Sequence, residues 1–342
     1  MTLKEIAKRA DVSISTVSRI MNSLDDSFAS KEVRDRVWAI IKETGYVPNQ
    51  SARELKRNKN STLSKNTGTL TCILGRNKNM EDNPFFAQVA RAVEQQALSR
   101  GYSISISYSV FDIYNRDLIS LVESSKTDGA IVLGRFSDEA MRFLELHYKN
   151  LVYVGRNVID SAWNQIICDG YEATQTALEY LISRGHQRIG YIGEIENEIR
   201  YNAYVDTMHK HGLEFDTNLI IVSQHNGVGG YQGADEMLKK AKLLPTAVFC
   251  ATDVSAIAAM RRFVEAGIKI PQQLSIISID NIELSGFVSP MLTTVEMPII
   301  EMGNMAVDTL INHINKCYKL PIRIYFPNRL IIRESVGAPF TY

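Results

Sequence analysis

Apolar residues near the N-terminus recur at the spacing of an α-helix. The first predicted helix covers residues 3–10, and its apolar face consists of Leu3, Ile6, Ala7 and Ala10. After a turn at residues 11–13, a second helix is predicted to begin at Ile14, with an inner face of Val17, Ile20 and Met21. Ser13 stands in the position of an N-cap for this helix. Two helices joined by so short a turn must cross steeply, which is the geometry of a helix-turn-helix.

The second predicted helix carries a polar outer face made of Ile14, Ser15, Ser18 and Arg19. Its length suits the major groove of DNA, where Ser15 and Arg19 are able to hydrogen-bond base edges and Ile14 to contact a thymine methyl group. Phosphate contacts, which set register rather than specificity, are expected from Ser13, Thr16 and Asn22.

A third amphipathic helix is predicted over about residues 31–44. Its apolar stripe consists of Val33, Val37, Ile40 and Ile41. Ser30 is in place to cap its start and Gly45 to end it. The three helices together form a small bundle. Helical spacing alone is equally compatible with a bundle that has no role in DNA binding.

From residue 69 onward the pattern changes to short apolar runs that alternate with helical segments. The runs that read as strands are residues 69–75, 102–108, 129–134, 151–155, 188–193, 247–251 and 274–279. The helical segments between them are about 84–99, 114–124, 137–147, 171–184, 198–211, 229–241 and 253–266. Residues 292–295, a long helix at 299–316 and final strands at 323–326 and 329–335 complete the series. Such alternation predicts parallel sheets that are covered by helices on both faces.

The number of strands divides this body into two doubly wound lobes. We expect a DNA-binding domain at 1–48, a hinge and linker at 49–65 and an effector-binding and dimerisation body at 66–342. Within the body, the expected first lobe comprises about 66–160 and 293–320, and the second comprises about 161–292 and 321–335. A crossing between the lobes is therefore expected near residues 160–168.

Charge divides the chain of 342 residues in the same way. Residues 1–65 hold thirteen Lys and Arg against eight Asp and Glu, a net of +5, and since the whole chain has 38 of each kind, the remainder carries −5. A basic head on an acidic body fits phosphate attraction through one end only, although so modest an imbalance also arises by chance. We expect a cytoplasmic protein with no signal peptide, no membrane span and four reduced cysteines without metal-ligand spacing.

The stretch TLKEIAKRADVSISTVSRIMN, followed by GYVPNQSARELK, resembles the head and hinge of the LacI/GalR family of bacterial repressors. The resemblance implies that Tyr46 and Asn49 contact phosphates and that residues 49–57 form a hinge helix, ordered on operator DNA. It also implies that Leu55 wedges into a base step of the minor groove and kinks the duplex. We expect Thr2 and Ala52 to be further DNA contacts. The plain alternative for Leu55 is an apolar residue within a basic linker.

The resemblance extends over essentially the whole chain and implies a periplasmic-binding-protein-like body, with three crossovers and a cleft for a sugar between the lobes. Ligands of such sheets bind beside the carboxyl ends of the strands. The effector-binding candidates at those ends are Phe85, Phe86, Arg135, Arg200, His225, Thr252, Asp280 and Glu296. Arg200 and Asp280 match a family arginine and carboxylate that bind ligand hydroxyls. Gly155 departs from relatives that carry an acidic sugar contact there.

Five of these residues also have a structural interpretation. Phe85 and Phe86 are placed to form an aromatic staple at a helix start, Arg135 and Arg200 to be solvated, and His225 to be structural. Asp253 is placed to cap a helix, which leaves Thr252 as the expected ligand contact at that strand end.

Taken together, the sequence predicts a repressor whose binding to operator DNA is switched by a small sugar. The body most resembles the galactose- and galactoside-responsive repressors, while ribose, raffinose-type sugars and purine-like ligands remain alternatives. We expect a homodimer, because no heptad-bearing tail follows the last strand. No phosphate-binding loop, zinc spacing or nucleophile elbow occurs in the body, so we expect neither enzymatic activity nor a cofactor or metal. A solute-binding receptor without a DNA role is the second hypothesis.

Overall fold

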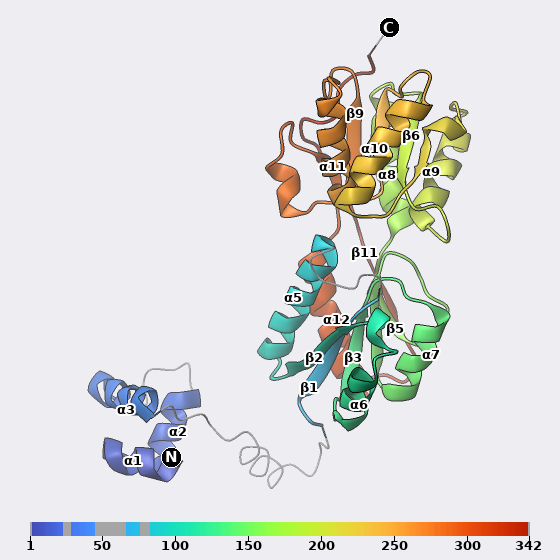
Figure 1. The fold of residues 1–342 in the computed structure, drawn as a ribbon. Coiled ribbons are helices and arrows are strands. Elements are labelled where there is room, and N and C mark those ends of the chain that lie inside the picture. The colour runs from blue at the N-terminus through green and yellow to red at the C-terminus, as the bar shows by residue number, and fades with distance from the viewer. Residues whose placement is uncertain (1, 23–28, 45–65, 76–82, 341–342) are drawn as a thin grey trace. The chain divides into compact units, whose positions relative to one another are not determined.

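The computed structural model describes residues 2–22, 29–44, 66–75 and 83–340 (Figure 1). The chain divides into two compact units, Met1–Lys65 and Asn66–Tyr342. We call them the head and the body and describe each by itself.

The head contains helices α1 (Leu3–Ala10), α2 (Ile14–Asn22) and α3 (Lys31–Thr44). Thr2 caps α1 in a capping box with Glu5, and Asp11 ends it in a left-handed conformation with φ of 52°. The Ser13 hydroxyl accepts a hydrogen bond from the backbone of Thr16 at 3.0 Å, which confirms Ser13 as the cap of α2.

One small core holds the three helices of the head together. Its buried members are Ile6, Ala7, Ala10, Val17, Ile20, Val37 and Ile40. Leu3, Met21, Val33 and Ile41 pack against them, so the apolar faces predicted for all three helices meet in this core. An ion pair at 3.0 Å between Arg9 of α1 and Glu43 of α3 closes the exposed side of the bundle. The predicted helical spacing is therefore confirmed.

The first lobe of the body is built on a parallel sheet of six strands in the order β11-β5-β4-β3-β1-β2. The strands are β1 (Thr69–Leu74), β2 (Ser103–Ser109), β3 (Gly129–Leu133), β4 (Leu151–Gly155), β5 (Asn164–Cys168) and β11 (Arg323–Phe326). One face is covered by α5 (Pro84–Ser99) and α12 (Ile299–Ile314). The other face is covered by α6 (Arg116–Ser124) and α7 (Asp138–His147), and η3 (Val110–Asp112) follows β2.

The second lobe has a sheet of the same size in the order β12-β10-β9-β8-β6-β7. Its strands are β6 (Ile189–Gly193), β7 (Ile220–Val222), β8 (Ala247–Cys250), β9 (Ser275–Asp280), β10 (Thr293–Glu296) and β12 (Arg329–Ile331), and only β12 runs antiparallel. Helices α8 (Gly170–Ser183) and α9 (Ile199–Lys210) cover one face. Helices α10 (Gly227–Lys240) and α11 (Asp253–Glu265) cover the other, and η4 (Thr217–Leu219) and η5 (Glu283–Gly286) lie in connections.

This architecture confirms the predicted helical head and the two-lobed α/β body, but it moves the lobe boundaries. Residues 164–168, expected at a crossing, form β5 of the first lobe, because every residue of this apolar run is buried in that sheet. Residues 293–296 belong to the second lobe and residues 323–326 to the first, the reverse of the expectation. The chain therefore passes between the lobes after β5, after β10 and after β11 (Figure 1).

No helix in the described ranges is both long and apolar enough to span a bilayer. Cys72, Cys168 and Cys250 are buried free thiols in β1, β5 and β8, while Cys317 is exposed.

Candidate functional site

The exposed side of α2 is the candidate DNA-contacting surface of the head. Ile14 is 47% exposed although it is apolar, and Ser15 and Arg19 are exposed beside it. Ser18 is half-buried. An apolar side chain that remains outside the small core of the head is available for a contact that the head itself does not make.

A cluster of hydroxyl groups lies at the N-terminus of α2. The Ser13 hydroxyl is 2.6 Å from that of Ser15 and 2.8 Å from that of Thr16. A helix N-terminus that presents hydroxyl and N–H groups is suited to bind a phosphate. The Thr2 hydroxyl caps α1 instead, but the residue is exposed.

The structure describes one of the predicted DNA contacts only in part and does not describe four others. Asn22 lies in α2, but its side chain is outside the described residues. Tyr46, Asn49, Ala52 and Leu55 all lie outside the described residues, as does the predicted hinge helix.

Arg200 is the centre of a buried polar network in the second lobe. It is 1% exposed, and its guanidinium donates from Nε and Nη2 to the two oxygens of Glu198, at 2.7 and 2.8 Å. Nη1 donates to the carbonyl of Ala251 at 2.6 Å, and Nη2 lies 2.9 Å from Nδ1 of His225. The sequence offered a ligand contact or a solvated arginine, whereas the structure places Arg200 in the interior with an internal carboxylate as its partner.

Glu194, Glu198 and His225 have ligand atoms within 4.8 Å of one another, the spacing of a metal site. The arginine, however, already engages both oxygens of Glu198 and stands beside His225. A guanidinium places positive charge where a cation would have to bind, so the cluster suits an arginine rather than a metal ion.

Asp280, the last residue of β9, pairs with Arg156 of the first lobe. Both side chains are buried, at 3% and 7% exposure. Burial raises the pKa of Asp280, and the nearby Arg156 and Arg200 partly offset this rise. The backbone of Asp280 has a φ of 134°, a strained value for a residue other than glycine, and such strain gathers at functional sites.

Phe85 and Phe86 open helix α5 and are both buried. The guanidinium carbon of Arg156 lies 4.2 Å from the ring centroid of Phe85 and 5.6 Å from that of Phe86. Phe86 also packs on Gly134, whose φ of +81° suits glycine and where a side-chain carbon would lie 2.8 Å from the ring. The two aromatic side chains thus face the loops that follow β3 and β4.

The remaining predicted effector contacts, Arg135, Thr252 and Glu296, are engaged by other groups of the protein. Arg135 reaches across the lobes to the Asn197 carbonyl at 2.5 Å and to Glu194 at 3.3 Å. Thr252 is the N-cap of α11, the role the sequence assigned to Asp253, and is 3% exposed. Glu296 accepts from Asn281 at 2.9 Å and pairs with Arg329 at 2.7 Å.

A cavity of about 20 Å³ remains between the lobes. Its lining comprises Phe86, Gly134, Arg135, Tyr153, Arg156, Asn157, Glu198 and Arg200. This volume is close to the smallest that can hold one water molecule. At Gly155, where the resemblance implied an acidic contact in some relatives, a side-chain carbon would lie 2.0 Å from the hydroxyl of Tyr153. Tyr153 thus fills the space that any side chain at position 155 would need.

Asp253 is a fully buried carboxylate that the sequence interpreted only as a cap. Its oxygens accept from the Ser278 and Thr294 hydroxyls, both at 2.6 Å, and from the backbone of Ile282 at 2.9 Å. Burial and the neighbouring Asp280 raise its pKa to about 7, although the two hydroxyls act in the opposite direction.

This pKa predicts a pH dependence of stability. A carboxyl whose pKa is about 7 when folded and near 4 when unfolded binds a proton more tightly in the folded state between these values. Its contribution to the free energy of unfolding therefore falls as pH rises from about 4 to 7, by up to about 1.4 kcal/mol per pH unit. Urea unfolding of the wild type and of Asp253→Asn across this range measures it. Parallel pH profiles for the two proteins would contradict the assignment, because only the wild type retains the titrating group.

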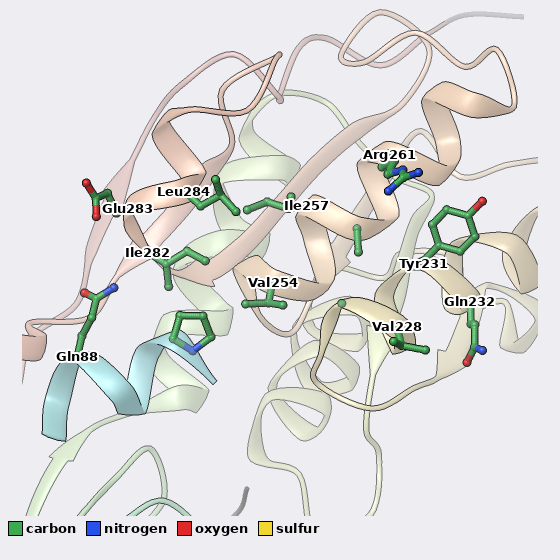
Figure 2. A pocket seen from close by; sticks show the side chains of 13 residues that line it. Gln88, Val228, Tyr231, Gln232, Val254, Ile257, Arg261, Ile282, Glu283 and Leu284 are labelled. Atoms are coloured by element: carbon green, nitrogen blue, oxygen red, sulfur yellow. The ribbon is translucent and has the colours of Figure 1, made fainter. Parts of the chain in front are cut away.

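A much wider hollow, of about 870 Å³, lies on a helical surface rather than between the strand ends of the two lobes (Figure 2). We call it the α10–α11 groove. Its lining comprises Pro84, Gln88, Gly227, Val228, Tyr231, Gln232, Val254, Ile257, Ala258, Arg261, Ile282, Glu283 and Leu284. Val228 is 67% exposed and Leu284 53%. Figure 2 shows Val254 and Ile257 at its apolar centre, with Gln88, Glu283, Arg261 and Gln232 around it.

Comparison with known proteins gives two matches along the chain. Residues 2–49 match the family described as bacterial regulatory proteins, lacI family. Residues 178–336 match a periplasmic binding protein-like domain. A protein named HTH-type transcriptional repressor PurR, from Klebsiella pneumoniae subsp. pneumoniae, is 30% identical over 99% of this chain and 98% of its own.

Two solved structures are similar over most of the body or the whole chain. The complex of the transcriptional regulator CelR with cellobiose covers 98% of this chain and 99% of that one, with 25% identity and a TM-score of 0.71. A LacI family regulator from Enterococcus faecium with bound ribose covers 80% of this chain and 100% of that one, with 25% identity and a TM-score of 0.68.

Proposed function

We propose, because this chain belongs to the lacI family of bacterial regulatory proteins, that a small molecule switches its affinity for operator DNA. We propose that this effector is a sugar and that it binds between the two lobes of the body. The chain is a DNA-binding transcriptional repressor with a ligand-binding body, and its relatives are repressors rather than enzymes. This family membership removes the second hypothesis of a solute receptor without a DNA role. The identity of the effector, the residues that bind it and the domain limits at 48 and 65 belong to the proposal.

The observation that carries the switch is the convergence of polar side chains from both lobes. Arg156 and Asn157 of the first lobe face Glu198 and Arg200 of the second across one small cavity. A ligand with several hydroxyl groups, bound to both sides, changes the angle between the lobes because it favours one of their arrangements. The coupling must be reciprocal, so operator DNA shifts effector affinity by the same factor.

Sugars are the effector class we favour. Carboxylate and guanidinium groups such as those of Asp280 and Arg200 bind vicinal hydroxyls well. Relatives with bound cellobiose and ribose support the same class. Galactose and galactosides come first, on the sequence resemblance of the body. A thermal-shift screen of galactose, galactosides, cellobiose and ribose tests this, and a protein stabilised by none of them would contradict the sugar class.

In the head, we propose that α2 enters the major groove and that Arg19 and Ser15 read base edges, with Ser13 and Thr16 on phosphates. Arg19→Ala is expected to weaken binding to the specific operator by about 10- to 100-fold, the value of one good base contact, while non-specific DNA binding changes little. Gel shifts with operator and with scrambled DNA measure both affinities.

Arg36→Ala is the matched control, because it removes the same charge from an exposed site on α3. It is expected to leave the ratio of specific to non-specific affinity unchanged. Equal losses from the two variants would contradict base reading by Arg19.

We further propose that the protein binds DNA as a homodimer and that the second copy occupies the α10–α11 groove. The groove is apolar at its centre and polar at its margin, as protein interfaces are. Pro84 and Gln88 belong to the first lobe and the remaining lining residues to the second. A partner in this groove therefore touches both lobes, so a movement between them changes the spacing of the two heads.

A further inference from the structure

Arg156 is held by contacts that resemble those of a bound ligand. One side of its guanidinium meets the carboxylate of Asp280, which ends β9 of the second lobe. Its guanidinium carbon lies over the ring of Phe85, 4.2 Å from the centroid, at the start of α5 in the first lobe. A carboxylate at the edge and an aromatic ring on the face are the two elements with which proteins bind planar cations.

The guanidinium also lies where an effector is expected. Asp280 is the last residue of β9, and Phe85 lies in the first turn of the helix that comes after β1. Both are therefore at the edge where ligands of parallel sheets bind. The free space beside Arg156 is only about 20 Å³, which a sugar cannot enter. A ligand that reaches Asp280 must therefore displace the arginine or separate the lobes.

The ion pair between Arg156 and Asp280 joins the two lobes through their interior. The other ion pair between lobes in the described part of the body joins Arg135 to Glu194, whose side chains are 34% and 29% exposed. Exposed pairs contribute little, whereas breaking a buried pair leaves a charge in the interior. Loss of Arg156 is therefore expected to destabilise this arrangement of the lobes more than loss of Arg135.

We propose that Arg156 is an internal ligand of the effector site, one that occupies Asp280 and the face of Phe85 and closes the body when no effector is present. The inference rests on the proposed function only in naming the site an effector site. An effector then binds by competition with a side chain of the same protein. Removing the guanidinium should raise the affinity for a hydroxyl-bearing effector on the order of tenfold, because the bound arginine no longer has to be displaced.

The test uses methylguanidinium chloride as a substitute for the missing side chain. In the full-length Arg156→Met variant, whose methionine keeps the length of the stem, the vacated place should bind methylguanidinium saturably. At about ten times its Kd, the melting temperature should rise by about 3 °C. In the wild type, the side chain of Arg156 already fills this site, so the melting temperature should show no saturable rise.

Three further variants make the result specific. Arg156→Met/Asp280→Asn should lose the response, because the carboxylate that binds the cation is gone. Arg100→Met, which removes an arginine that pairs with Asp308 on the surface of the first lobe, should behave as the wild type. Arg156→Gln is the alternative if the methionine variant does not fold, and it should bind the probe more weakly. A folded Arg156 variant that does not respond, a responsive wild type or a responsive double variant overturns the proposal.

Operator gel shifts on the same proteins separate this inference from the proposed function. A protein that binds operator but shows no methylguanidinium response in its Arg156 variants is a regulator without an internal ligand. A protein whose variants respond to the probe but which binds no operator retains the internal ligand and contradicts the proposed function.

Discussion

Arg200→Ala is expected to lower the free energy of unfolding of the body by about 3–5 kcal/mol, the cost of removing one partner from a buried ion pair. Glu198 is only 2% exposed and would keep its charge without the guanidinium that binds both of its oxygens. The Ala251 carbonyl would also lose its donor. Urea unfolding of the full chain, followed by circular dichroism, measures the loss.

Two controls identify the cause. Arg200→Met/Glu198→Gln removes both charges and keeps the volume, so it should recover most of the lost stability. Arg100→Ala breaks an ion pair with Asp308 that is 53% and 28% exposed, and it should change stability by no more than about 1 kcal/mol. If Arg200→Ala unfolds at the wild-type urea concentration, the buried network does not have the role we assign to it.

This result changes how variants of the site should be interpreted. If Arg200 were only the ligand contact that the resemblance implies, Arg200→Ala would abolish the effector response and leave operator binding intact. The burial of Arg200 means that a lost response would follow from an unstable body as readily as from a lost ligand contact. Asp280→Asn is the gentler test, because it keeps the shape of the side chain while removing the charge.

The second large effect is expected at the α10–α11 groove. Val228→Asp places a charge at the groove, on a side chain that is 67% exposed, so the fold of one copy should be unaffected. In a dimer the charge would be buried without a partner, and the dissociation constant should rise by at least about 100-fold. Sedimentation at micromolar concentration should then show a monomer, and operator affinity should fall with it.

Leu146→Asp is the matched control for this variant. Leu146 is an apolar residue of α7, is 80% exposed and lies outside the groove. It should remain a dimer with wild-type operator affinity. A Val228→Asp protein that remains dimeric would move the interface to another surface.

Much of the fold follows from local patterns. The apolar runs at β1, β3, β4, β8 and β9 are buried on both faces and lie between helices whose spacing is clear, so they were predicted within about two residues. The three-residue strand β7 was not predicted, because it is too short to show a period. The lobe boundaries were misplaced because the partner of a strand is set by long-range pairing, as between β5 and β11.

The site was predictable only in part, for a related reason. The rule that ligands bind at strand ends led to Phe86, Arg135 and Arg200, which do line one cavity. It did not show that Arg156 meets Asp280, a contact between residues 124 positions apart. The available signal was a cation directly after one strand and a carboxylate at the end of another. Glu198 and Asp253 were missed because their roles depend on burial, which the sequence does not specify.

The three passages of the chain between the lobes also constrain how the protein is made. Neither lobe is a continuous segment, since β11 completes the first sheet and β12 the second, and both come from residues 323–331. During synthesis from the N-terminus, β5 and β10 are therefore sheet edges with exposed backbone groups until this short segment leaves the ribosome. Both lobes reach their final form together, at one late step, and a chain interrupted before residue 323 presents two unpaired edges to its neighbours.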